Sequence, residues 1–194
     1  MDNFGAHLDT TCDYITNSVA GTFLVYYGFR HIAGWDLWAA SVIGALPIVF
    51  GTIRQAQGMD KPISYPCYWF GVPRPVSMLL IVSLLNSNFF NLPDEPWRSI
   101  AQYSSAGLIA VLSFLHLSKV PFCNHKKRNW FGAMRFGAWW FLIGTPVFTL
   151  VAWLVWDRAG LVSDYMLFSL AMYTFFNWSQ IPRVDFDRMR HYLK

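Results

Sequence analysis

The sequence is poor in charge: 13% of its 194 residues are Asp, Glu, Lys or Arg, whereas a soluble domain usually carries about 25%. Hydrophobic residues make up 55% of the chain and aromatic residues 19%. So few charged side chains cannot cover the surface of a water-soluble fold of this size. The composition therefore argues against a soluble globular protein and indicates that much of the surface faces lipid.

Signatures of common catalytic sites are also missing, since the sequence contains no GxSxG, HExxH, P-loop or GxGxxG pattern. The cysteines are few: Cys12, Cys67 and Cys123, with no CxxC pair. A zinc site built from these thiols and His125 would need ligands from three separate segments, so three unrelated thiols are the preferred interpretation. We therefore expect no metal and no cofactor. A membrane enzyme that uses His116 and the nearby thiols is a less favoured alternative, because no acid–base pair with a nucleophile is visible.

Apolar runs of membrane-spanning length recur along the chain. Each is near the 20 or so residues that cross a bilayer as a helix, and they occupy residues 14–31, 35–53, 76–92, 100–117, 136–156 and 160–178. The first thirteen residues contain no Lys or Arg, which is unlike a secretory signal, so we expect the first run to remain a span. The predicted fold is an all-α, polytopic membrane protein, a single domain of six transmembrane helices.

Short gaps containing glycine or proline join the spans in pairs. Gly34, the run Pro93–Pro96 and the run Asp157–Gly160 have the composition of tight turns. They predict three helical hairpins. Within the second span, Gly44 and Gly51 lie seven residues apart and would permit a close helix crossing, while Pro47 and Pro146 are expected to kink their helices.

Lys and Arg are distributed unequally between the two predicted faces. Three lie on one side: Arg30, Arg98 and Arg158. The other side, which includes both termini, holds twelve: Arg54, Lys61, Arg74, Lys119, Lys126, Lys127, Arg128, Arg135, Arg183, Arg188, Arg190 and Lys194. The positive-inside rule places that side in the cytoplasm, in keeping with a bacterial inner membrane. It also explains the net charge of +4 without a nucleic-acid partner.

A short aromatic and basic motif recurs on this basic side. Trp69, Trp130 and Trp178 are each followed five residues later by an arginine, and a glycine or proline lies between. We interpret the motif as an interfacial bend in which Trp lies among lipid headgroups and Arg contacts anionic lipid. A threefold repeat of hairpins around a central site is the functional alternative.

Polar residues near the opposite ends of the spans are candidates for a solute pathway, because polar groups within a bilayer are costly. Asn86 and Asn88 lie in the outer half of the third span, Gln102 in the outer half of the fourth, and Asp164 near the outer end of the sixth. Together they predict a polar vestibule. The structural alternative is that amides and hydroxyls join helices, with Asp164 paired to Arg30 or Arg158.

His116 lies one turn inside the predicted inner end of the fourth span. It is expected to reach the interface, with a proton relay as the alternative; pairing with His31 in a haem site is disfavoured because the two lie at opposite faces. Lys126, Lys127 and Arg128, with Arg188 and Arg190, form a basic inner surface that predicts contact with anionic lipid or with an acidic partner. Residues 184–194 predict a short amphipathic helix.

Two functions follow from this pattern. The first is a channel or carrier for a small solute or ion, lined by Asn86, Asn88, Gln102 and Asp164. The second is a non-catalytic anchor or sensor subunit of a larger assembly, docking through its basic inner surface. In both cases the lipid bilayer is a partner, and we expect a homo-oligomer or a protein complex because the chain is small.

Overall fold

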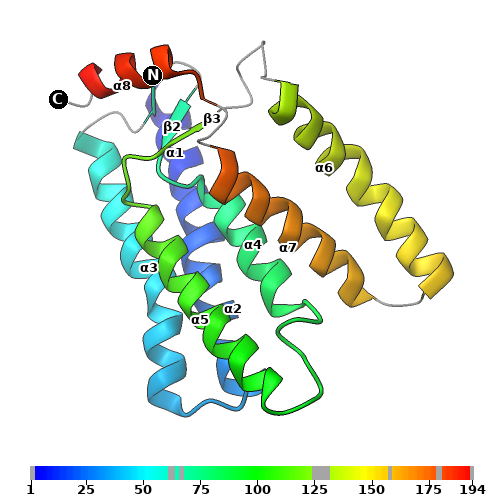
Figure 1. Cartoon of the computed structure of the whole chain (residues 1–194). Coiled ribbons are helices and arrows are strands. Elements are labelled where there is room, and N and C mark those ends of the chain that lie inside the picture. The colour runs from blue at the N-terminus through cyan, green and yellow to red at the C-terminus, as the bar shows by residue number, and fades with distance from the viewer. Residues whose placement is uncertain are drawn as a thin grey trace.

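The computed structural model describes residues 3–60, 64–65, 68–123, 132–156, 159–177 and 181–192. The chain is mostly helical, which confirms the predicted all-α class (Figure 1). The α-helices are α1 (Asn3–Tyr14), α2 (Ala20–Tyr27), α3 (Leu37–Asp60), α4 (Arg74–Leu85), α5 (Trp97–Leu115), α6 (Gly132–Val151), α7 (Ala159–Phe176) and α8 (Arg183–Tyr192).

The first helix begins well before the predicted span. α1 and α2 are joined by the π-helical segment Ile15–Val19, and a second such segment, Gly28–Ile32, follows α2. In the first, the Ala20 N–H donates to the Ile15 carbonyl, and in the second the Ala33 N–H donates to the Gly28 carbonyl over 2.9 Å. The chain is therefore helical without a break from Asn3 to Ile32. The helix thus extends beyond the predicted span, whose start near residue 14 stays a prediction.

α3 is the one helix of the described residues that is both long and apolar enough to cross a membrane, over Leu37–Gly58. It begins where the sequence predicts a turn. Gly34 has a φ of 75°, and the Asp36 carboxylate accepts hydrogen bonds from the Trp38 and Ala39 N–H groups at 2.9 and 3.0 Å, which caps the helix. Only 28% of its apolar window is buried, so α3 is not enclosed by the rest of the bundle.

α2 and α3 pack closely through the two glycines that the sequence singled out. A Cβ atom on Gly44 would lie 3.2 Å from the Tyr26 Cα, and one on Gly51 would lie 2.6 Å from the Ser18 Cβ. The helix continues through Pro47, and beside it the Ile48 N–H donates to the Thr22 hydroxyl over 3.1 Å. This close crossing confirms the prediction from the glycine spacing.

The predicted second hairpin is more open than the other two. α2 packs on α3 and α6 packs on α7, whereas α4 packs mainly against α7 and α5 mainly against α3. α6 stands to one side of the bundle and contacts chiefly α7 (Figure 1). The arrangement therefore groups α2, α3, α4, α5 and α7 around one apolar core, which includes Phe29, Leu80, Leu84, Phe90 and Ile109.

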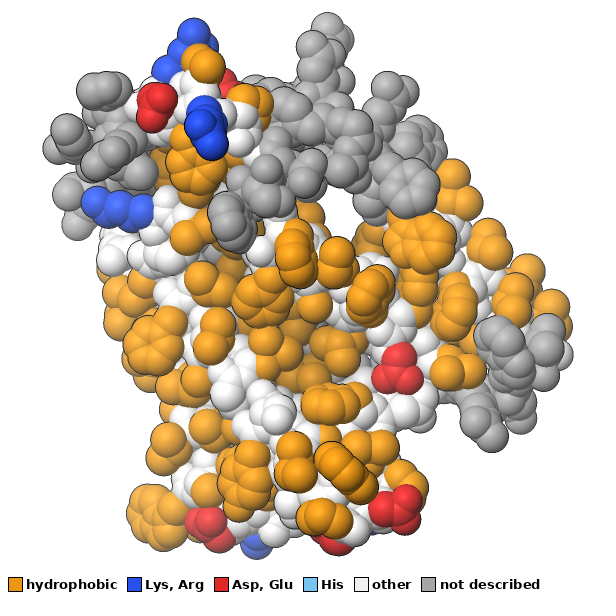
Figure 2. All heavy atoms as spheres, in the orientation of Figure 1, with side chains coloured by type: hydrophobic (Ala, Val, Ile, Leu, Met, Phe, Trp, Pro, Cys, Tyr) orange, Lys and Arg blue, Asp and Glu red, His pale blue; other side chains and the backbone are white. Residues whose placement is uncertain are grey.

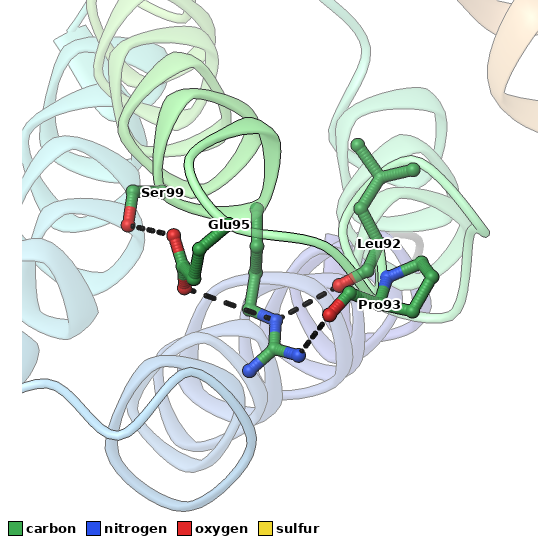
Figure 3. A network of polar contacts seen from close by, with 5 residues as sticks. Leu92, Pro93, Glu95 and Ser99 are labelled. Atoms are coloured by element: carbon green, nitrogen blue, oxygen red, sulfur yellow. Dashed lines mark hydrogen bonds and ion pairs between the residues drawn. The ribbon is translucent and has the colours of Figure 1, made fainter.

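α4 is shorter than predicted, because it ends at Leu85 and the chain then turns through residues 86–91. Polar contacts hold the following connection to α5. The Arg98 guanidinium donates to the Leu92 and Pro93 carbonyls at 2.8 and 2.6 Å, and the Ser99 hydroxyl donates to the Glu95 carboxylate at 2.8 Å (Figure 3). Asparagines at positions 86, 88 and 91 favour turns over helix, which explains the early end of α4.

Both longer connections contribute strands to a small sheet that the sequence did not predict. β1 (Ser64–Tyr65), β2 (Tyr68–Phe70) and β3 (Pro121–Cys123) are antiparallel, with Ser64 opposite Trp69 and Trp69 opposite Phe122. Helix α8 lies beside this sheet, at the end of the molecule that holds both termini (Figure 1). Tyr68, Phe70, Ile181 and Met189 form a second apolar core that includes residues of β2 and α8.

The outer surface of the bundle is apolar along its length. Exposed fractions reach 79% for Trp38, 70% for Leu142 and 67% for Phe23. In the view of Figure 2, hydrophobic side chains cover the flanks, and most of the Lys, Arg, Asp and Glu side chains gather at the two ends. Several polar side chains are buried instead, among them Ser83, Ser105, Ser113 and Thr174.

Candidate functional site

Two of the predicted pathway residues meet at the end of α4. The Asn88 backbone N–H donates to Asp164 Oδ1 over 2.9 Å, and the Asn88 side-chain amide donates to Asp164 Oδ2 over 2.7 Å. Gly160 lies against the same amide, because a Cβ atom there would be 2.6 Å from Asn88 Oδ1. This Asn88–Asp164 pair joins the turn after α4 to the first turns of α7.

Asn86 and Gln102 do not join this pair through the hydrogen bonds of the described residues. The exposed Asn86 amide donates back to the Val82 carbonyl of its own helix over 2.8 Å, and Gln102 is buried within α5. Asn86 thus caps α4, and the shared vestibule stays a prediction. Of the two alternative ion pairs, the one with Arg30 is not formed: Asp164 binds Asn88, and the Arg30 guanidinium donates to the Trp35 carbonyl over 2.9 Å.

The predicted basic surface is only partly described. Lys126, Lys127 and Arg128 lie outside the described residues, as does Arg158, and of Arg190 only the backbone within α8 is described. Arg183 and Arg188 are exposed on α8, and Asp185 of that helix accepts a hydrogen bond from the Tyr68 hydroxyl over 2.5 Å. The predicted C-terminal helix thus forms, and the sheet holds it at the end of the bundle.

A second polar cluster, which we call the buried arginine site, lies near this end. It consists of Arg54, Gln55, Arg74, Ser77 and His116, from α3, α4 and the end of α5. Only 4% of Arg54 and 7% of Arg74 is exposed. Burial of two guanidinium groups is costly, since each loses its hydration.

Arg54 is held by the carboxyl end of α5. Its Nη1 atom donates to the His116 carbonyl, where the helix dipole is negative. Gly71, with a φ of 74°, passes directly over this contact, because a Cβ atom there would lie against Arg54 Nη1 and 2.6 Å from the His116 carbonyl oxygen. Glycine is therefore needed at position 71 both for its backbone conformation and for space.

Arg74 is held from two other directions. Its Nη2 atom donates to Gln55 Oε1 over 2.5 Å, and its Nη1 atom makes a long contact of 3.4 Å with the Thr10 carbonyl in α1. Burial lowers the pKa of the Arg74 guanidinium, and the charge of Asp13 partly opposes that shift. Among the described residues, the buried Nε atom of Arg74 has no hydrogen-bond partner.

His116 contacts the same serine as Arg74. The Ser77 hydroxyl donates to the Arg74 carbonyl over 2.9 Å, and Ser77 Oγ lies 2.9 Å from His116 Nε2. Because the one hydroxyl hydrogen is used on the carbonyl, Nε2 carries the proton and Ser77 accepts it. In the neutral ring Nδ1 is then a bare acceptor, and it is buried without a partner.

Sequence reasoning missed this site. It counted Arg54 among the basic residues of the inner side, assigned Arg74 to anionic lipid and expected His116 to reach the interface, whereas all three are buried. Its one usable signal was the Trp69–Phe70–Gly71 motif leading to Arg74, in which the glycine does form a bend. The interpretation failed because burial of Arg74 depends on α1 and α3, which are distant in sequence.

Metal-ligating residues do not gather among the described side chains, where no group of three His, Cys, Asp or Glu lies close enough to hold an ion. Cys12 is exposed in α1, and Cys123 lies in β3. Cys67 and His125, the other members of the zinc set weighed above, lie outside the described residues.

Comparisons with known proteins give no relative: no family model, curated protein or solved structure matches this chain significantly. Functional argument therefore rests on the residues themselves.

Proposed function

We propose that this chain is an integral membrane protein with six spans, both termini at the inner face, in a bacterial inner membrane. The support is the distribution of side chains, apolar on the flanks and charged at the two ends (Figure 2). A soluble protein rarely exposes contiguous apolar surface on this scale. α3 strengthens the argument because its apolar window is mostly unburied, unlike the core helix of a soluble protein.

Helix lengths agree with several crossings. α5 has 19 residues and α7 has 18, which correspond to about 27–29 Å at 1.5 Å per residue. The N-terminal helix continues from Asn3 to Ile32, and α6 continues through Trp156 as a π-helical segment. α4 is the exception: its 12 residues reach only about 18 Å, and the turns after Leu85 complete the distance to the outer connection.

We further propose that the bundle forms a pathway for a small polar solute. The observation that carries this proposal is the polar interior, since buried side chains on α4, α5 and α7 include Ser83, Gln102, Ser105, Ser113 and Thr174. On α7, the Ser169 and Thr174 hydroxyls are buried without a hydrogen-bond partner. Groups of this kind replace the hydration of a passing solute.

Flux through the purified protein in liposomes tests the pathway. Gln102→Leu should lower the permeation of small polar solutes by roughly tenfold, because a hydrogen bond to the solute is worth about 1–1.5 kcal/mol. Tyr103→Leu is the matched control, since Tyr103 is next to Gln102 on α5 but is 68% exposed. Asp164→Ala, at the outer end, should abolish flux. Wild-type protein that passes no solute, or equal flux in Gln102→Leu and Tyr103→Leu, would overturn the proposal.

A docking role is the second candidate, favoured by the surface of α8. Val184 is 62% exposed and Phe186 36% exposed, beside the exposed Arg188. An apolar and basic surface of this kind fits anionic lipid or an acidic partner. Neutralising Lys126, Lys127 and Arg128 should release any co-purifying protein, whereas Arg30→Gln at the other end should not. A homo-oligomer that purifies in mild detergent without any other protein would contradict this role.

A further inference from the structure

Two asparagines and one aspartate form a polar patch on an otherwise apolar flank of the bundle. Asn86 and Asn88, in the turn after α4, are exposed, and Asp164, in the second turn of α7, is half-buried beside Asn88. Exposed apolar side chains adjoin them on the same helix faces, since Leu79 lies two turns before Asn86 and Phe168 one turn after Asp164. We call these three polar residues the outer polar patch.

The outer polar patch lies well inside the outer end of the bundle. Ser77 on α4 is level with His116 at the end of α5, because Ser77 Oγ lies 2.9 Å from His116 Nε2. From that level α4 extends about 12 Å to Leu85, whereas α5 extends about 28 Å to Trp97, at 1.5 Å per residue. Figure 1 agrees, since α4 and α7 stop short of α3 and α5 on the side of the Gly34 connection. In the proposed membrane placement, the patch therefore faces the hydrocarbon region.

The patch is left with hydrogen-bond acceptors and one negative charge. The Asn86 amide donates to the Val82 carbonyl, and the backbone and side-chain N–H groups of Asn88 donate to the Asp164 carboxylate. Within the described part of the chain, no donor reaches Asn86 Oδ1 or Asn88 Oδ1, and no basic side chain pairs with Asp164. Because charged groups at membrane depth are costly unless they are paired, the group that completes this patch is a cation with several hydrogen-bond donors.

We propose that the outer polar patch docks a transmembrane helix of another protein, one that carries a Lys or Arg at the depth of Asp164. Ammonium and guanidinium groups supply both the positive charge and the N–H donors, and the apolar residues of such a helix would cover Leu79 and Phe168. A partner helix fits better than a solute, because Asn86 and Asn88 are exposed on the flank and are not enclosed by the bundle. This inference rests on the proposed membrane placement and is independent of the solute pathway.

A second copy of this chain fits the patch less well. Of the three arginines on the outer side, Arg30 donates to the Trp35 carbonyl and Arg98 donates to two carbonyls of its own connection, near the outer end. Neither guanidinium is therefore available at the depth of Asp164. Arg158 lies outside the described residues, so its contribution has to be measured.

Energy transfer between the labelled full chain and a designed single helix in nanodiscs tests the proposal. The probe is a polyleucine transmembrane helix with one Lys away from its ends, and two control helices carry Leu or Glu in place of that Lys. Wild-type protein should bind the Lys helix about tenfold more tightly than either control. Equal binding of the three helices would overturn the inference. Protein that fails to enter the bilayer would refute the membrane placement, and the inference with it.

Variants of the chain test whether the charge of Asp164 causes this preference. Asp164→Asn keeps the size and an acceptor for Asn88 but removes the charge, so the Lys and Leu helices should then bind within about twofold of each other. Asp94→Asn, the same change in the exposed outer connection, is the matched control and should keep the full preference. If Asp164→Asn fails to fold, the wild-type comparison of the Lys and Leu helices still decides the proposal.

Two results with these variants would contradict the partner helix. A preference for the Lys helix that survives Asp164→Asn would show that the patch does not cause it. Self-association of the chain that is lost in both Asp164→Asn and Arg158→Gln would assign the patch to a second copy. Wild-type protein that stays monomeric in nanodiscs and prefers the Lys helix would support the proposal.

Discussion

At the scale of single residues, Gly71 sets the distance between strand β2 and the end of α5. Its N–H donates to the Val120 carbonyl over 2.8 Å, and the next N–H, of Val72, donates to the Leu115 carbonyl over 3.3 Å. The turn therefore lies flat on α5, with the Arg54 guanidinium beneath it. Any side chain at position 71 would have to displace backbone as well as Arg54.

Gly71→Ala should destabilise the protein by about 1–3 kcal/mol, because alanine is strained at a φ of 74° and its Cβ would meet the His116 and Leu115 carbonyls. Gly107→Ala is the control: nothing lies within 4 Å of a Cβ there, and the change should stabilise α5 by about 0.5–1 kcal/mol. Unfolding free energies in detergent measure both. Equal stabilities for the two variants would contradict the role given to Gly71.

The Asn88–Asp164 pair makes a second prediction at this scale. In a double-mutant cycle, Asn88→Ala and Asp164→Ala should show a coupling of about 0.5–3 kcal/mol, because both remove the hydrogen bond from the Asn88 amide to Asp164 Oδ2. Asn86→Ala with Asp164→Ala is the comparison cycle and should be additive, since Asn86 bonds its own helix. Unfolding free energies of the six proteins in these two cycles give both couplings, and two equal values would show that the coupling is not specific to the Asn88–Asp164 pair.

At the scale of elements, the α2–α3 contact depends on small residues. Gly44 lies against the backbone of Tyr26, which cannot swing away as a flexible side chain would. Gly51 lies against Ser18, which is itself buried. Within lipid such close backbone approach is a main source of helix association, since apolar contacts alone give no preference over lipid tails.

Gly44→Leu should therefore separate α2 from α3 and lower the unfolding free energy by about 1–3 kcal/mol, as overpacking does. Hydrogen exchange should rise in α2 because its packing partner moves away. Gly107→Leu places the same side chain in open space and should leave exchange in α2 unchanged. The proposed role of Gly44 fails if both leucine variants raise exchange in α2 to the same extent.

At the scale of the whole molecule, the segments predicted to share one face do lie together. Both termini, the sheet and α8 occupy one end, and the connection containing Gly34 lies at the other (Figure 1). We propose, from the count of Lys and Arg on the two sides, that the first of these ends faces the cytoplasm. The exposed Cys12 and the exposed Asp94 therefore offer one probe for each face.

An impermeant thiol reagent applied to intact cells should modify Asp94→Cys and should leave the native Cys12 unmodified. After the cells are lysed, Cys12 should react as well, which shows that it is accessible. The measurement is the labelled fraction at each position by mass spectrometry. Labelling of Cys12 from outside intact cells would reverse the orientation and move the buried arginine site to the outer face.

The sequence predicted those features that depend on local pattern. Apolar runs marked the helices, Gly34 marked a turn, and Gly44 with Gly51 marked a close crossing. It did not predict the sheet, because strands of two or three residues are too short for an alternating pattern. It also placed the end of the third span at residue 92, since apolar residues such as Phe89, Phe90 and Leu92 continue past the end of α4 at Leu85.

The candidate sites were less predictable than the fold. Asn88 and Asp164 were both singled out, but their direct pairing depends on the packing of α4 against α7. The buried arginine site requires α1, α3, α4 and α5 to meet, and no local pattern distinguishes a buried arginine from one at a lipid interface. Tertiary packing decides between these environments, so the residues alone could not.

The π-helical segment Ile15–Val19 fixes the rotational phase of the N-terminal helix relative to α2. A π-helical turn holds one residue more than an α-helical turn, so the segment offsets everything before it by about 100°. Deleting one residue there would restore regular winding and rotate Thr10 and Asp13 away from Arg74. A deletion of one residue in this segment would thereby take the Thr10 carbonyl and the Asp13 carboxylate away from the buried arginine site.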